Sequence, residues 1–169
     1  MALIAATNQA TPEEMAARLI RWANLYPPID VERAARLLGV DIVDLELSSG
    51  VGGLLVKEAP RRWLIIVNSR LTDPAERRFT IAHELGHWTL HRPLIRRDST
   101  EVSNRRMEHE AHRFAQALLL PPDEVEEDVI HGCLDSIPGR YKVPMAVVAT
   151  VLRRWGYAYW HRHEWESNS

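Results

Sequence analysis

The chain has 169 residues, which is enough for one domain with a buried core and too few for two ordinary domains. Its composition, 46% hydrophobic and 26% charged, is that of a globular protein and excludes a disordered or fibrous chain. A formal net charge of −2 excludes a global attraction to nucleic acid or anionic membranes. The single cysteine, Cys133, excludes an internal disulfide, and we expect its thiol to be partly buried.

The first residues of the chain carry neither the basic region nor the long apolar run of a signal peptide. No later apolar run approaches the roughly 18 residues that a membrane span requires. We therefore expect a cytoplasmic protein without a membrane partner.

Two short helices are predicted near the start of the chain. Thr11 is a typical N-cap, and it is followed by a proline and two glutamates that suit the positive end of a helix. Apolar residues then recur at helical spacing until Pro27 and Pro28 end the pattern. Asp30 caps a second helix, which ends at Gly39.

From Val40 the hydrophobic pattern changes to a period of two. The alternating segments are IVDLEL at 42–47, GLLVKE at 53–58 and WLIIVN at 63–68, with turn-like residues between them. We expect two or three strands of a small antiparallel sheet.

Four helical patterns follow the strands. The first begins at Asp73 and ends before Pro93, and the second stops at Pro121. We interpret the polar and basic stretch 93–106 as a loop, and the tail after Gly156 as strand-like at first and then frayed. The four patterns cover about residues 74–92, 103–120, 123–130 and 144–156.

The stretch FTIAHELGHWTLH places His83 and His87 one helical turn apart, with Glu84 between them. On a helix the two histidines lie about 40° apart and Glu84 about 100° from His83, whereas Leu85 lies on the opposite, apolar side. Two imidazoles one turn apart can bind one metal ion while the other face packs into the core. The spacing therefore predicts a metal site, and the competing interpretation is a surface helix with partnered histidines.

Two histidines leave a tetrahedral metal site short of a third protein ligand. His91 follows on the same helix, but it lies about 12 Å along the axis from His83, too far for both to bind one ion. We therefore expect His91 to have a supporting or structural role.

The later segment MEHEAHRFAQALLLP offers two glutamates as the third ligand. Glu108 lies about 60° from the centre of the apolar face and Glu110 about 100°, so we expect Glu108 to be nearer the core and favour it as the ligand. Glu110 has the spacing for surface ion pairs with Arg106 and Arg113. The alternative for Glu108 is a buried salt bridge to an arginine at 77–78.

The stretches ERRFTIAHELGHWTLH and MEHEAHRFAQALLLP resemble the sequence blocks of the ImmA/IrrE family of bacterial and phage metallopeptidases. The resemblance is specific from Glu76 to Pro122 and weaker over 28–68. It implies that His83, His87 and Glu108 are zinc ligands and that Glu84 is the catalytic glutamate.

The chain departs from this family at His112, where the family has Asn or Asp one turn after the ligand Glu108. Asn or Asp there could accept a hydrogen bond from a ligand imidazole and fix its tautomer. His112 could do so only when neutral and correctly turned. As an alternative it could bind the metal as a fourth protein ligand, which would make the site structural.

The expected metal is zinc, because two imidazoles and a carboxylate suit it, although manganese or iron would fit similar ligands. In an open site zinc activates a water and polarises the scissile carbonyl, and Glu84 takes the proton and passes it to the leaving amine. The resemblance implies a protein substrate, a helix-turn-helix transcriptional repressor. His131, Tyr141 and the tail histidines are candidate donors to the oxyanion.

A second interpretation is a non-catalytic regulatory module that binds DNA or protein. In it the metal ion has no open coordination position and only stabilises the fold. Its support is a group of arginines, which could instead steer an acidic substrate segment toward the metal. We expect direct nucleic-acid binding to be the less favoured use. The group consists of Arg92, Arg96, Arg97, Arg105 and Arg106, with Arg153 and Arg154 near the tail.

The elements and motifs together predict an α+β fold, a mainly helical single domain with a small antiparallel sheet packed near the HExxH active-site helix. Residues 1–27 are expected to form an N-terminal helix and residues 28–130 the zinc metallopeptidase core. Residues 131–169 are expected to form a C-terminal helix and tail packed on the same domain.

Overall fold

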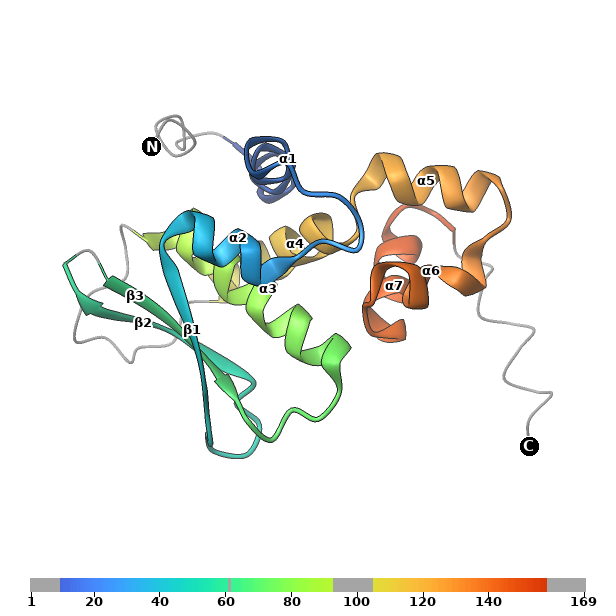
Figure 1. The fold of residues 1–169 in the computed structure, drawn as a ribbon. Coiled ribbons are helices and arrows are strands. Elements are labelled where there is room, and N and C mark those ends of the chain that lie inside the picture. The colour runs from blue at the N-terminus through green and yellow to red at the C-terminus, as the bar shows by residue number, and fades with distance from the viewer. Residues whose placement is uncertain (1–9, 61, 93–104, 158–169) are drawn as a thin grey trace.

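The computed structural model describes residues 10–60, 62–92 and 105–157, and within them helices dominate over a three-stranded sheet (Figure 1). The predicted class, a mainly helical α+β fold, is confirmed. In chain order the elements are α1 (Pro12–Ala23), α2 (Val31–Leu38), β1 (Val40–Leu45), β2 (Gly53–Ala59), β3 (Arg62–Asn68), α3 (Pro74–His91), α4 (Arg105–Leu119), α5 (Pro122–Ile130), the short 3-10 helix η3 (Leu134–Ser136), α6 (Ile137–Tyr141) and α7 (Met145–Arg154).

The first two helices begin with the side-chain caps that the sequence predicts. At α1 the Thr11 hydroxyl accepts a hydrogen bond from the Glu14 N–H, and the Glu14 carboxylate accepts one from the Thr11 N–H. At α2 the Asp30 carboxylate accepts from the Arg33 N–H at 2.8 Å, and Gly39 ends the helix in the left-handed conformation. These bonds satisfy backbone groups that a helix end leaves without partners.

The sheet is mixed, which differs from the expected antiparallel arrangement. The central strand β3 pairs antiparallel with β2, where Gly53 lies opposite Val67, and parallel with β1, where Val40 lies opposite Trp63. An alternating sequence does not indicate strand direction, because side chains alternate between faces in both kinds of pairing. The β2–β3 hairpin occupies one edge of β3, so β1, arriving from α2, pairs at the other edge and runs in the same direction.

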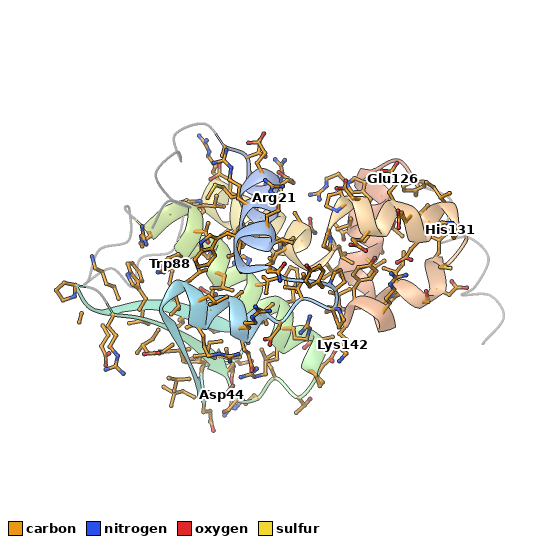
Figure 2. All side chains as sticks on the ribbon, turned by 45° about the horizontal axis from the view of Figure 1, so that its top comes forward. Arg21, Asp44, Trp88, Glu126, His131 and Lys142 are labelled. Atoms are coloured by element: carbon orange, nitrogen blue, oxygen red, sulfur yellow. The ribbon has the colours of Figure 1, made fainter. Side chains whose placement is uncertain are left out.

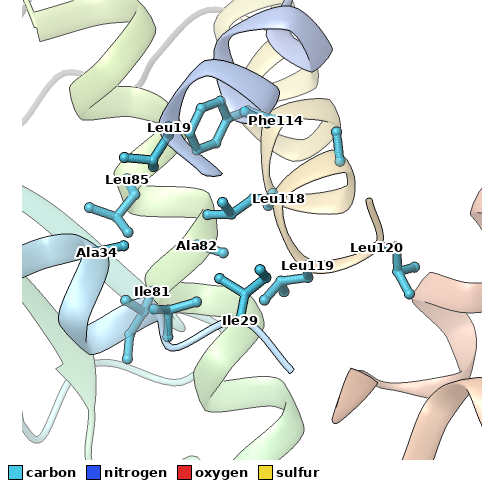
Figure 3. Close-up of a cluster of buried hydrophobic side chains, with 14 of the residues drawn as sticks. Leu19, Ile29, Ala34, Ile81, Ala82, Leu85, Phe114, Leu118, Leu119 and Leu120 are labelled. Carbon is cyan, nitrogen blue, oxygen red and sulfur yellow. The ribbon is translucent and has the colours of Figure 1, made fainter. Parts of the chain in front are cut away.

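Helix α3 lies between the sheet and α4, and its apolar face is at the centre of the core (Figure 1). Figure 3 shows Ile81, Ala82 and Leu85 of α3 close to Phe114 and Leu118 of α4. All five side chains are fully buried. Burial of each large apolar side chain contributes about 1.5–3 kcal/mol, so this contact fixes how α3 and α4 lie against each other.

The backbones of α3 and α4 come into close contact at Gly86. A Cβ atom at this position would lie 2.9 Å from the carbonyl oxygen of Ala111, 3.0 Å from its Cα and 3.2 Å from Cδ1 of Phe114. Because the first two atoms belong to the backbone, no side-chain rotation can make room for it. Gly86 lies between His83 and His87, so the same close approach brings the histidines of α3 near α4.

The C-terminal helices α5, α6 and α7 lie on the side of the molecule away from the sheet (Figure 1). The buried carboxylate of Asp128 on α5 accepts a hydrogen bond from the Tyr141 hydroxyl at 2.8 Å and forms an ion pair with Arg140. These contacts join α5 to α6. No helix in the described part of the chain combines the length and apolar character needed to cross a membrane.

Two predicted segments lie mostly outside the described residues. The predicted loop at 93–106 falls there except for its last two residues, which already belong to α4. The predicted strand-like tail falls there from residue 158 onward.

The side chain of Cys133 is exposed, so the prediction of a partly buried thiol is wrong. The residue lies in the turn between α5 and η3, where its Sγ has only a weak contact, 3.7 Å, with the carbonyl oxygen of His131. A turn leaves a small side chain without neighbours to cover it.

We therefore expect one thiol per folded chain to react with an aromatic disulfide reagent at a rate within about tenfold of a free cysteine, because exposure controls access to the thiolate. The released chromophore measures the rate, and Cys133→Ser is the blank. A thiol that reacts only in denaturant would contradict the exposed position.

Candidate metal centre

The helix that carries the histidine motif begins at its predicted cap. The Asp73 carboxylate accepts a hydrogen bond from the Ala75 N–H at 2.8 Å, and Pro74 occupies the first turn. The apolar side of α3 is buried, and the side chains of His83 and His87 are 18% and 9% exposed. Both histidines of the motif are therefore largely covered, although they are polar.

Three side chains from α3 and α4 converge on one point. The Nε2 atoms of His83 and His87 lie 3.1 Å apart, and the Glu108 carboxylate lies 3.1 Å from the first and 3.3 Å from the second. Two ligands of a tetrahedral zinc ion, each about 2.0–2.1 Å from it, are separated by roughly 3.3 Å. The donor set of His83, His87 and Glu108 therefore has the composition and spacing to hold one metal ion.

Burial keeps both histidines of this donor set neutral. Burial lowers the pKa of His83, although the Glu108 carboxylate acts in the opposite direction. Burial also lowers the pKa of His87, to about 3, and the neighbouring His83 and His91 lower it further. A neutral imidazole has a lone pair available for a metal, so little proton release accompanies binding near pH 7.

Glu84 lies beside the donor set and under strand β2. Its side chain is buried, and Cγ lies 3.4 Å from the position that a Cβ on Gly53 would occupy. Burial, and secondly the charge of Glu108, raise the pKa of Glu84 to about 8. A hydrogen bond with the backbone of Leu55 acts in the opposite direction and lowers this pKa. A carboxyl group with a pKa near neutrality can both accept and return a proton.

His91 lies outside the donor set, as its position along the helix predicts. Its Nδ1 lies 3.2 Å from Nδ1 of His87, and its Nε2 lies 3.0 Å from the Glu110 carboxylate. The predicted ion pair between Glu110 and Arg106 is present at 2.7 Å. His91 therefore connects the donor set to an ion pair on α4.

The expectations about the two glutamates and their arginines are partly wrong. The side chain of Glu108 is 46% exposed and that of Glu110 only 28%, because His91 and Arg106 cover Glu110 whereas Glu108 faces the open side of the donor set. Arg113 does not pair with Glu110; it makes two hydrogen bonds to Glu13 of α1, at 2.7 and 2.9 Å.

The alternative salt bridge for Glu108 does not form. Arg77 pairs with Asp44 and Glu32 instead, and Arg78 donates to the backbone carbonyls of Ile29 and Lys142. Arg77 thus ties α3 to α2 and β1, and Arg78 ties α3 to the residues just before α2 and just after α6.

His112 lies next to the donor set without belonging to it. Its ring contacts Phe79 edge-on, with centroids 4.9 Å apart, and its centroid is 6.1 Å from that of His83. The Nδ1 atom of His83 is buried and has no hydrogen-bond partner among the described residues, so His112 does not provide the bond expected of Asn or Asp. Among these residues no fourth donor joins the three.

The residues that the sequence offered as donors to the oxyanion are either far from the donor set, already hydrogen-bonded, or outside the described residues. Figure 2 shows His131 at the outer end of α5, far from Trp88, which follows His87 on α3. The hydroxyl of Tyr141 donates to Asp128, and burial, together with this hydrogen bond, raises the pKa of the tyrosine. The tail histidines fall outside the described residues.

The predicted arginine group is only partly described. Arg92 lies over the ring of Trp88 at 4.5 Å, Arg106 pairs with Glu110, and Arg154 donates to Gln116. Arg96 and Arg97 fall outside the described residues. Arg92, Arg106 and Arg154 are thus engaged in separate local contacts.

The chain is similar to known peptidases. The family model of the IrrE N-terminal-like domain, a peptidase family, matches residues 35–153. Metallopeptidase ImmA of Bacillus subtilis (strain 168) is 30% identical over an alignment of 139 residues, and the alignment covers 79% of this chain and 77% of that protein.

A solved structure, a Mycobacterium tuberculosis transcriptional regulator, matches 83% of this chain with a TM-score of 0.62 at 20% identity. This chain spans 46% of that regulator's length, and a likeness at this identity shows the fold alone. The fold, the family model and the ImmA relative agree, and the chain belongs to the ImmA/IrrE family of metallopeptidases.

Proposed function

We propose that this protein is a zinc-dependent peptidase that hydrolyses peptide bonds in a protein substrate, with His83, His87 and Glu108 as zinc ligands and Glu84 as general base. The observation that carries the proposal is the donor set itself, whose three ligand atoms lie 3.1–3.3 Å apart with a buried glutamate beside them. Three protein ligands suit a catalytic site, because such sites keep one position for water or substrate.

Zinc is the proposed metal because two imidazoles and one carboxylate match its preferences, although manganese or iron would fit the same atoms. When bound, it would supply a polarised scissile carbonyl and a water of lowered pKa. The half-exposed side chain of Glu108 leaves one side of the donor set accessible to a substrate.

Glu84 performs the proton transfers in this proposal. Its carboxylate removes a proton from the attacking water as the new carbon–oxygen bond forms, and then gives that proton to the nitrogen of the amine as the carbon–nitrogen bond breaks. Burial beside β2 raises the pKa of this carboxyl group to about 8 in the metal-free protein, which favours its holding the proton until the amine takes it.

The proposed substrate is a helix-turn-helix transcriptional repressor, which the resemblance to ImmA/IrrE peptidases supports. A membrane partner is not proposed. Binding of DNA through the arginines is a weaker candidate, since Arg92, Arg106 and Arg154 are engaged in contacts within the chain.

We expect about one zinc ion per wild-type chain, and loss of most of it in His87→Ala and Glu108→Ala, because each substitution removes one of three protein ligands. Elemental mass spectrometry after zinc reconstitution and dialysis measures the content. The control is Glu76→Ala, which removes an exposed carboxylate of α3 outside the donor set and should retain the metal. Wild type that stays empty would overturn the proposed function.

A further inference from the structure

A chain of hydrogen bonds leads from His87 away from the donor set. It runs from Nδ1 of His87 to Nδ1 of His91, at 3.2 Å, and from Nε2 of His91 to the Glu110 carboxylate, at 3.0 Å. Arg106 pairs with the second oxygen of Glu110 at 2.7 Å. His87 and His91 are both buried, so water does not compete strongly for these bonds.

Only one arrangement of protons satisfies this chain when His87 is a metal ligand. The Nε2 atom of His87, which faces the donor set, must keep its lone pair, so the proton of the neutral ring lies on Nδ1. His91 then accepts at Nδ1 and carries its own proton on Nε2, from which it donates to Glu110. Arg106 donates to Glu110 and helps to hold the pKa of that carboxyl below its usual value.

The second histidine of the donor set has no such support. Nδ1 of His83 is buried and lacks a hydrogen-bond partner among the described residues, although its ring lies close to His112. The hydrogen bonds that orient the ligand rings are therefore concentrated on His87. A change in His91 should act on metal binding through that one ring.

We propose that His91 is a positioning residue which, together with Glu110, holds His87 in the Nδ1-protonated tautomer and so sets the affinity of the site for zinc. The inference rests on the proposed function, because it requires His87 to be a ligand. It goes beyond that function by assigning a task to two residues outside the donor set. Outer partners of this kind typically change metal affinity by about 10-fold to 100-fold.

The test compares the zinc dissociation constants of three proteins by competition with a chromophoric chelator. His91→Phe fills the buried space and removes the acceptor, and we expect zinc to bind about 10-fold to 100-fold more weakly. His91→Asn places a carbonyl oxygen where Nδ1 was, so that it can still accept from His87, and should recover much of the affinity. A merely space-filling role for His91 predicts the opposite order.

A second test variant, Glu110→Gln, has a matched control, Glu13→Gln. Glu110→Gln removes the charge at the end of the hydrogen-bond chain and should weaken zinc binding several-fold. Glu13→Gln breaks the ion pair between Glu13 of α1 and Arg113 of α4, which lies outside the chain of hydrogen bonds. It should leave the zinc dissociation constant within about twofold of wild type. Thermal melts of the metal-free proteins show that each is folded at the temperature of the titration.

A spectroscopic measurement on the wild type needs no variant. Long-range nitrogen–proton correlation spectra of zinc-loaded, histidine-labelled protein should show the proton of His87 on Nδ1 and that of His91 on Nε2. A proton on Nε2 of His87, or on Nδ1 of His91, would overturn the inference. So would a folded His91→Phe protein with wild-type zinc affinity.

The two proposals fail in different ways. Wild type that binds no zinc removes both the proposed function and this inference. Wild type that binds zinc as strongly as folded His91→Phe removes only the inference, and the donor set stands without it.

Discussion

Replacement of Glu84 by glutamine is expected to lower peptide hydrolysis by about 100-fold to 10,000-fold while zinc binding persists, because an amide of the same shape cannot take a proton from water. Glu84 is beside the donor set and is not one of its three members. The measurement is cleavage of a fluorogenic casein and of candidate repressors by zinc-loaded protein, with zinc content determined on the same samples.

Glu76→Gln is the matched control, since it changes an exposed glutamate of the same helix and should cleave like wild type. A zinc-loaded Glu84→Gln protein with full activity would contradict the role of general base. If zinc-loaded wild type cleaves no repressor but binds duplex DNA with an affinity that falls steeply with salt, the non-catalytic module becomes the better account.

Gly86→Val is expected to destabilise the fold by about 2–3 kcal/mol, since a branched side chain would overlap backbone atoms of α4. The nearest of these, the Ala111 carbonyl oxygen, lies 2.9 Å from the Cβ position. The loss should exceed the few tenths of a kcal/mol that valine gains over glycine in helix propensity. Urea denaturation of the metal-free protein measures the change in the free energy of unfolding.

Because α3 and α4 would separate, Gly86→Val should also weaken zinc binding by moving Glu108 away from His83 and His87. The control is Gly139→Val in α6, where a new Cβ would meet nothing within 4 Å, and its stability should stay within about 0.5 kcal/mol of wild type. Equal stability of the two variants would mean that the close approach of the helices is not a constraint.

The features that the sequence predicted correctly depend on neighbours in the chain. Thr11 with Glu14, Asp30 and Asp73 cap their helices through backbone groups two or three positions away. The pairing of His83 with His87 likewise follows from one turn of helix. Short-range geometry of this kind is set before the fold brings distant segments together.

The features that were missed depend on distant partners. Arg113 pairs with Glu13, 100 positions away, and not with a neighbour on its own helix. Glu110 is less exposed than Glu108 because of contacts with His91, which helical periodicity in α4 alone cannot indicate. The parallel direction of β1 likewise depends on which edge of β3 remains free.

The donor set joins two helices, and its outermost residues, His83 and Glu108, lie 25 positions apart in the chain. An ion bound there would act as a removable cross-link, which closes that segment into a loop and is absent from the unfolded chain. By mass action the folded state would gain about 1.4 kcal/mol for each tenfold rise in free zinc above the dissociation constant. The lifetime of the protein in a cell would then follow the supply of zinc, because scarcity would favour the unfolded chain that proteases remove.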